Sequence, residues 1–143
     1  KYGNSNLAVC GDGPTCLAMI ASYKTGKTVT LAEIVKWCGN KYYINGSGTS
    51  YNIFSAAKKY GIKSVTKTSS TSMVLKALQE GKPVVSVQKR GLFTNNGTFI
   101  VLRGIDKGGK ILVNSPKDRS VYRKLYDLQS QIAKTSTTFM IIN

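Results

Sequence analysis

The sequence predicts an α+β fold, with helices in the first half of the chain and an antiparallel sheet in the second half. Up to residue 82, apolar residues recur at helical spacing between capping residues and glycines. From Pro83 onward, short runs rich in β-branched residues alternate with turn sequences. The chain has 143 residues, of which 41% are hydrophobic, so we expect a single domain, residues 1–143, with its own core.

Capping and stop signals delimit the expected helices. In the first of them, the apolar positions Leu17, Ile20 and Ala21 share one helical face, and Gly26 follows. Thr30 and Glu33 form a capping box, which starts a second helix that stops at Gly39. The four helices expected in this half span residues 14–23, 30–37, 51–60 and 72–79.

The sequence of the second half predicts strands joined by turns. Residues 106–109, Asp-Lys-Gly-Gly, are typical of a hairpin turn between two strands. A further helix is expected over residues 121–133, although the polar pattern there leaves its ends open. The expected strands span residues 84–88, 99–104, 111–114 and 138–142.

The charge of the chain is strongly positive. Lys and Arg number 21 against six acidic residues, which gives a formal net charge of +15. Such a surface attracts anionic polymers, but the lysines are scattered, so a solvated basic surface is the main alternative. No run approaches the roughly 20 apolar residues of a membrane span, and Lys1 does not begin a signal peptide. We therefore expect a soluble chain, either an excised domain or a mature form.

The three cysteines, Cys10, Cys16 and Cys38, are too few for a disulfide framework. At most one disulfide is expected, with its pairing open. Cys16 and Cys38 fall inside helical patterns and are expected to be small packing residues. Because the chain contains no histidine, the usual spacings of a zinc site are missing, and we expect neither a metal nor another cofactor.

Residues 11–19, Gly-Asp-Gly-Pro-Thr-Cys-Leu-Ala-Met, resemble the segment around the nucleophile in bacteriocin-leader-peptidase-like members of the papain superfamily of cysteine peptidases. A helix start suits a nucleophile because it favours the thiolate. The similarity implies a papain-like fold, with N-terminal helices packed on a C-terminal antiparallel sheet. It continues through residues 25–30, 42–50, 97–106 and 111–116.

At the positions that carry the family's chemistry, the sequence differs from the pattern. Asp12 stands at the position of the nucleophilic cysteine, Thr98 at that of the general-base histidine, and Ser115 at that of the orienting carboxylate. The oxyanion-hole glutamine is expected upstream of Lys1. An aspartate at a helix start is a good N-cap, so we expect Asp12 to cap the helix. Since a thiol nucleophile normally needs an imidazole, the sequence predicts a catalytically inactive pseudopeptidase, not an enzyme.

The expected function is to bind a peptide, a cell-wall fragment or a protein partner in the former active-site cleft. The resemblance also implies an extracellular or cell-envelope setting in a Gram-positive bacterium. The residues expected to line the cleft are Asp12, Gly13, Tyr43, Gly48, Thr98 and Ser115.

Two other functions remain open at this point. The chain could be a peptidase or amidase with a non-standard site such as Cys10, or a basic module that binds wall polymers or nucleic acid. Aromatic residues around the glycine-rich loop are expected to pack in the core, with a stacking platform for a ligand as the alternative. These residues are Trp37, Tyr42, Tyr43 and Tyr51.

Overall fold

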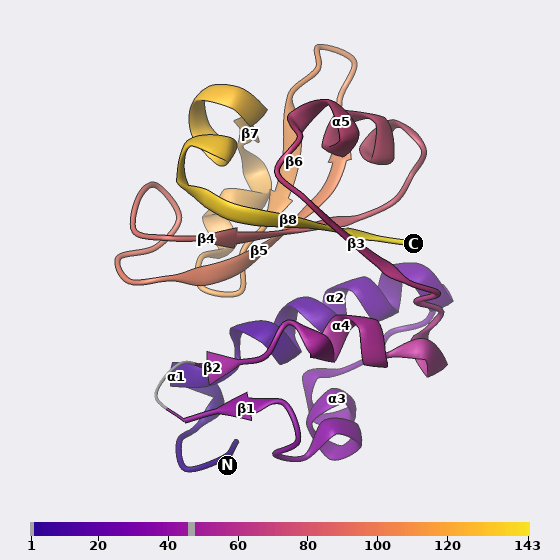
Figure 1. Ribbon diagram of the computed structural model, residues 1–143, viewed down its shortest axis with the longest axis vertical. Coiled ribbons are helices and arrows are strands. Elements are labelled where there is room, and N and C mark those ends of the chain that lie inside the picture. Colours follow the sequence, from indigo (N-terminus) through magenta and orange to yellow (C-terminus); the bar gives the residue numbers. More distant parts are fainter. Residues whose placement is uncertain (1, 46–47) are drawn as a thin grey trace. The chain divides into compact units, whose positions relative to one another are not determined.

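The computed structural model describes residues 2–45 and 48–143, except for the side chains of Ala8 and Val9 (Figure 1). The expected loop residues Gly46 and Ser47 lie outside this range. The chain divides into two compact units, Lys1–Ser64 and Val65–Asn143. Helices dominate the first unit and an antiparallel sheet dominates the second, which confirms the α+β class. That residues 1–143 form a single domain stays a prediction.

The first unit is built around α2, the longest of its helices, whose buried residues include Leu17 and Ile20. Helices α3 and α4 contact it, and their buried residues include Ile34 and Phe54. The Thr30 hydroxyl accepts a hydrogen bond from the Glu33 N–H at 3.1 Å, as expected for the cap of α3. The elements of this unit are α1 (Leu7–Cys10), α2 (Asp12–Thr25), α3 (Leu31–Cys38), β1 (Tyr43–Ile44), β2 (Gly48–Thr49), α4 (Asn52–Ala56) and the 3₁₀ turn η1 (Lys58–Tyr60).

The helix expected over residues 51–60 is interrupted. Ala57, with φ −83° and ψ 47°, separates α4 from η1, and its side chain is fully buried. Ile53, Phe54 and Tyr60 are buried on either side of this break. Tertiary burial of these apolar residues therefore outweighs the helical pattern of the segment.

The second unit is a six-stranded antiparallel sheet in the order β3-β8-β4-β5-β6-β7, with α5 packed on β4, β5 and β8. Val74 and Leu78 of α5 enter the same core as Ile100 and Leu102 of β5. All the expected strands are present, which confirms the sheet. The elements are β3 (Val65–Thr68), α5 (Thr71–Gln79), β4 (Val84–Gln88), β5 (Thr98–Ile105), β6 (Ile111–Asn114), η2 (Arg119–Arg123), β7 (Leu125–Tyr126), η3 (Leu128–Ile132), η4 (Ala133–Thr135) and β8 (Ser136–Ile142).

The single helix expected over residues 121–133 is wrong. The segment instead forms the 3₁₀ turn η2, the strand β7, the π-helical turn η3 and the 3₁₀ turn η4. Leu125 and Tyr126 pair with Leu112 and Ile111 of β6, and this pairing breaks the helical pattern.

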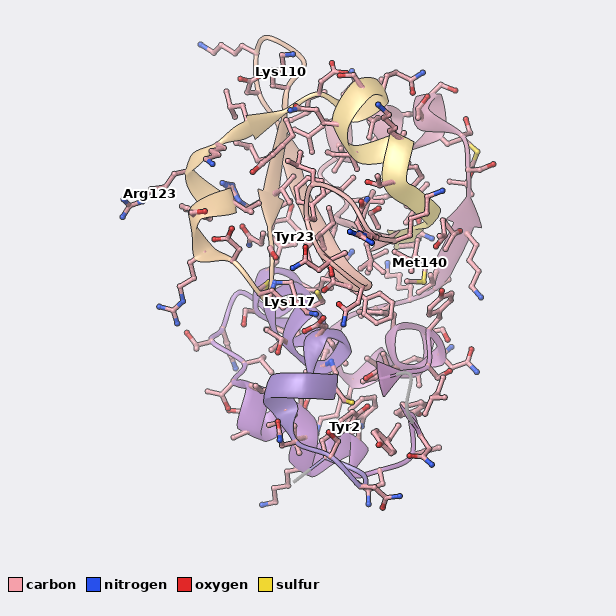
Figure 2. The ribbon with its side chains drawn as sticks, turned by 90° about the vertical axis from the view of Figure 1, so that its left-hand side faces the viewer. Tyr2, Tyr23, Lys110, Lys117, Arg123 and Met140 are labelled. Atoms are coloured by element: carbon pink, nitrogen blue, oxygen red, sulfur yellow. The ribbon has the colours of Figure 1, made fainter. Side chains whose placement is uncertain are left out.

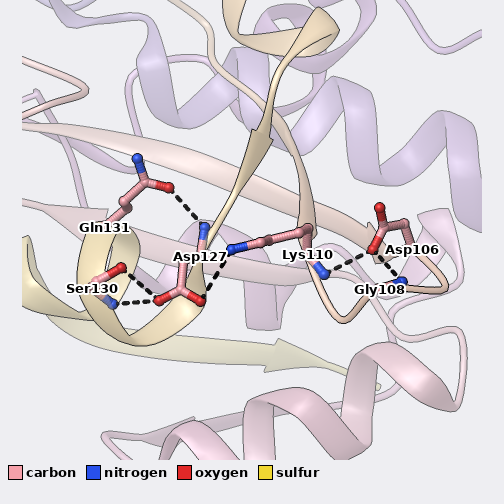
Figure 3. A network of polar contacts seen from close by, with 6 residues as sticks. All are labelled: Asp106, Gly108, Lys110, Asp127, Ser130 and Gln131. Atoms are coloured by element: carbon pink, nitrogen blue, oxygen red, sulfur yellow. Dashed lines mark hydrogen bonds and ion pairs between the residues drawn. The ribbon is translucent and has the colours of Figure 1, made fainter.

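Polar contacts fix the turns around this segment (Figure 3). The Asp127 carboxylate caps η3 by accepting hydrogen bonds from the Ser130 N–H at 2.8 Å and its hydroxyl at 2.6 Å. Lys110 lies 3.6 Å from the same carboxylate. In the turn between β5 and β6, Asp106 accepts from the N–H groups of Gly108 and Lys110, which confirms the expected hairpin. Within residues 2–45 and 48–143, no helix has the length and apolar character needed to cross a membrane.

Candidate functional site

The start of α2 is set by a tight bend between two helices. The Gly11 N–H donates to the Leu7 carbonyl at 3.0 Å, and a Cβ at Gly11 would lie only 2.3 Å from that oxygen. Gly11 is the N-cap of α2, with no side-chain cap hydrogen bond, and Asp12 is the first helical residue. The expectation that Asp12 caps the helix is therefore wrong. Its carboxylate instead stands in the first turn, where the helix dipole favours a negative charge.

Thr49 of β2 anchors this helix start. A Cβ at Gly13 would lie 2.6 Å from the Thr49 Cβ, so only glycine permits this approach of β2 to α2. The Thr49 hydroxyl lies 2.8 Å from the hydroxyl of the fully buried Tyr2 and donates to the Cys10 carbonyl at 3.3 Å. Tyr2 and Thr49 are thus positioning residues for the bend, and nothing in the local sequence pattern indicated them.

The three thiols are free, and their environments differ. Cys16 and Cys38 are buried, which confirms that they are packing residues. Burial raises the pKa of the Cys16 thiol well above its usual value, and the nearby Asp12 charge raises it further. Burial also raises the pKa of Cys38. Only Cys10, at the end of α1, is half-exposed. A reactive thiolate in this chain would therefore be that of Cys10.

The aromatic residues near the glycine-rich loop separate into two groups. Trp37 stacks on Tyr42 with ring centroids 5.9 Å apart, and it contacts Tyr60 edge-on at 5.8 Å. Tyr43 instead meets Tyr2 edge-on at 5.3 Å. These contacts support the packing role.

The β1 and β2 strands bring further candidate residues to the first unit. Tyr43 is half-exposed and pairs with Thr49 across the two strands. Gly48 has φ +97°, and, its chain neighbours apart, none of the described residues places an atom within 4 Å of the position that a Cβ would take. Since Thr49 contacts Gly13, these strands and the start of α2 form one local arrangement.

Thr98 and Ser115 belong to neighbouring strands of the second unit. Thr98 begins β5 and Ser115 directly follows β6, and both are buried. The Thr98 hydroxyl donates to the Phe99 carbonyl at 3.2 Å, and the Ser115 hydroxyl accepts from the Lys117 N–H at 3.2 Å. Asp12 belongs to the first unit. The assignment of Asp12, Thr98 and Ser115 to the family's catalytic positions stays a prediction.

The titratable groups limit the chemistry open to the chain. With no histidine in the sequence, the chain cannot supply an imidazole as general base. In the part of the chain that the structure describes, no three His, Cys, Asp or Glu residues form a group that could hold a metal ion.

Two solved structures have the same fold. The peptidase domain of Streptococcus ComA, a bifunctional ABC transporter involved in a quorum-sensing pathway, has a TM-score of 0.67 and 19% identity. That match covers 94% of this chain and 90% of the other. A putative C39-like peptidase from Bacillus anthracis has a TM-score of 0.62 and 18% identity, over 94% of this chain and 89% of the other. No curated protein sequence matches the chain significantly.

The family comparison confirms the resemblance seen in the sequence and corrects one expectation. Residues 4–138 match the Peptidase_C39 like family, and the two similar structures are a peptidase domain and a putative peptidase. Peptidases are enzymes, so the expectation that the chain is not an enzyme is contradicted by this membership. Because the match spans nearly the whole sequence, the chain belongs to the Peptidase_C39 like family.

Proposed function

We propose that this domain recognises peptides, and that it does so at the start of α2 and the adjoining strands β1 and β2. The observation that supports the proposal most strongly is the family match over residues 4–138, since the substrates of peptidases are peptides. The peptide belongs to a cell-wall fragment or a protein partner met outside the cell or in the envelope. The proposed host is a Gram-positive bacterium, as the resemblance in the sequence implies.

The first unit offers suitable surface for a peptide backbone. Asp12 and Tyr43 are half-exposed, so a carboxylate and an aromatic ring are accessible there. Gly48 has no side chain, so an extended chain can approach its backbone closely. The Tyr2–Thr49–Cys10 contacts hold these elements in place before a ligand arrives, which lowers the entropy cost of binding.

The test is to screen the full chain against a synthetic peptide array and to titrate the best peptide with variants. Asp12→Lys should weaken binding about tenfold or more, because it reverses a charge at the site. Glu80→Lys makes the same charge change at the end of α5 in the second unit, and it should alter the affinity by less than about twofold. Urea denaturation of each variant checks that a loss of binding does not come from unfolding.

Two results would refute the proposal. One is that no array peptide binds more tightly than about 1 mM. The other is that Asp12→Lys and Glu80→Lys weaken binding equally, which would place the peptide elsewhere.

A second candidate function, hydrolysis through Cys10, is favoured by one observation. Cys10 is half-exposed, whereas burial raises the pKa values of Cys16 and Cys38. Because the chain has no histidine, this candidate lacks the usual general base for a thiol nucleophile. If the candidate is correct, the selected peptide is cleaved, iodoacetamide blocks the cleavage, and Cys10→Ser abolishes it while Cys38→Ala does not. Cleavage that survives in Cys10→Ser would refute it.

A further inference from the structure

The arginines of the chain are unevenly distributed. Arginine occurs only at positions 90, 103, 119 and 123, whereas the 17 other basic residues, all lysines, are spread through both units. Three of the four arginines meet at η2. Arg103 of β5 reaches Tyr122 of η2, which carries Arg119 and Arg123 at its two ends.

Arg103 is held in a fixed orientation. Its Nε donates to the Asn114 Oδ1 at 2.9 Å and its Nη2 to the Tyr122 carbonyl at 3.2 Å. The guanidinium carbon also lies 4.1 Å from the centroid of the Tyr122 ring, as in a cation–π contact. Within the described residues, no carboxylate pairs with Arg103 within 4.0 Å. Its other N–H groups are therefore preorganised to bind an anion.

The remaining cations belong to η2 and to the residue that follows it. Residues three apart in a 3₁₀ helix share a side, so Arg119 lies on the same side as Tyr122. Arg123 is exposed and points away from the body of the unit (Figure 2). Lys124 follows it and is also exposed. We call the set Arg103, Arg119, Tyr122, Arg123 and Lys124 the arginine face.

One acidic residue lies beside the arginine face. The Asp118 carboxylate accepts hydrogen bonds from the Ser120 N–H at 2.9 Å and its hydroxyl at 2.7 Å. These bonds, with the charge of Lys124, lower the pKa of Asp118. The carboxylate is thus occupied in capping η2, and the four cations leave a net positive charge.

We propose that the arginine face binds a linear phosphodiester polymer of the polyol-phosphate type, through its phosphate groups. Arginine suits this ligand because its planar fork matches the oxygens of a phosphate. A single-stranded nucleic acid is disfavoured, because such ligands stack successive bases on several aromatic rings. The arginine face has one ring, Tyr122, and Arg103 already contacts it. The arginine face consists of residues of the second unit only, and the proposal does not rest on the proposed peptide site.

The central test compares two triple variants of the full chain that lose the same charge. One replaces Arg103, Arg119 and Arg123 with Gln, and the other replaces the exposed Lys27, Lys58 and Lys63 of the first unit with Gln. The ligand is poly(glycerol phosphate). The arginine variant should bind about tenfold more weakly or worse, and the dependence of log K on log salt should become shallower by roughly 0.7 for each lost phosphate contact. The lysine variant should stay within about twofold of the parent.

Equal losses of affinity in the two triple variants would overturn the proposal, because binding would then depend only on the overall charge of the chain. Tighter binding to single-stranded DNA or to anionic phospholipid vesicles would also overturn it.

If the triple arginine variant does not fold, the single variants Arg123→Gln and Lys58→Gln replace the comparison. Arg123→Gln should then lose more affinity than Lys58→Gln, by a smaller factor than in the triple variants. Tyr122→Leu keeps every charge and both hydrogen bonds of Arg103 but removes the ring beside its guanidinium, so it should weaken binding modestly; an unchanged affinity would show that the ring does not help to orient Arg103.

Discussion

Asp12 is best understood as a charge in the first turn of α2. The N-cap of this helix is Gly11, and Asp12 is its first helical residue. A negative charge at this place is stabilised by the helix dipole. This differs from a cap, whose effect depends on a hydrogen-bonding oxygen and survives replacement by asparagine.

The distinction gives a prediction for two variants. Asp12→Ala and Asp12→Asn should each lower the free energy of unfolding by about 0.3–1 kcal/mol, because both remove the charge. Urea denaturation at neutral pH measures the difference. An alanine variant about 1 kcal/mol less stable than the asparagine variant would show that Asp12 acts as a hydrogen-bonding cap after all.

Tyr2 contributes to the same region through its hydroxyl group. The residue is fully buried, its hydroxyl lies 2.8 Å from that of Thr49, and burial raises its pKa. Tyr2→Phe removes this hydrogen bond and should cost about 1 kcal/mol of unfolding free energy. Tyr122→Phe is the control: its side chain is 59% exposed and its ring is kept, so denaturation should find it near neutral. Equal effects of the two changes would mean that the Tyr2–Thr49 contact does not stabilise the fold.

Among the elements, the turns after β6 depend on aspartate caps. Hydrogen bonds from Ser130, mainly that of its hydroxyl, lower the pKa of Asp127, and the charge of Lys110 adds to the effect. A carboxylate whose pKa is lower in the folded state stabilises the fold above its unfolded pKa of about 4. This contribution is lost as the pH falls through the lowered folded pKa.

The corresponding prediction concerns acid denaturation. Asp127→Asn should be less stable than the parent at pH 6, and the difference should shrink as the pH falls below about 4, where the parent carboxylate becomes protonated. Unfolding free energies measured in urea from pH 6 to pH 2.5 would test this. A stability difference that stays constant across this range would show that the Asp127 charge is not involved.

Sequence-based prediction succeeded for elements that are fixed by contacts between neighbouring residues. It failed for elements that depend on residues distant in the sequence. The α3 cap at Thr30 and the turn at Asp106 are set by neighbouring residues, and both were predicted. The strand β7 exists because Tyr126 pairs with Ile111, fifteen residues away in sequence, so its local pattern indicated a helix instead. Short elements such as α1, β1 and β2 carry too few residues for a periodic signal, and they were missed.

The same limit applies to the candidate site. Asp12 and Gly13 could be selected from a sequence motif, whereas Thr49 matters through contacts with Gly13, Tyr2 and Cys10 that arise only on folding. Family membership was predicted correctly, because the motifs extend over most of the chain. The inference from missing residues to a missing activity was wrong.

At the scale of the whole molecule, the two units carry different proposed sites. The peptide site lies in the first unit, at the start of α2, and the arginine face lies in the second unit, at η2. Peptide binding through a shaped surface should survive moderate salt, whereas polymer binding should weaken steeply with salt.

The most direct test of the central claim, peptide recognition at the start of α2, is to record amide chemical shifts of the ¹⁵N-labelled full chain during titration with the array-selected peptide. We expect the largest changes at residues 11–15, 43–44 and 48–50. The sequence-based prediction adds changes at Thr98 and Ser115. Amides of residues 119–124 should respond to poly(glycerol phosphate) instead. Peptide-induced shifts confined to residues 119–124, or spread evenly over the lysine-bearing surface, would contradict the account.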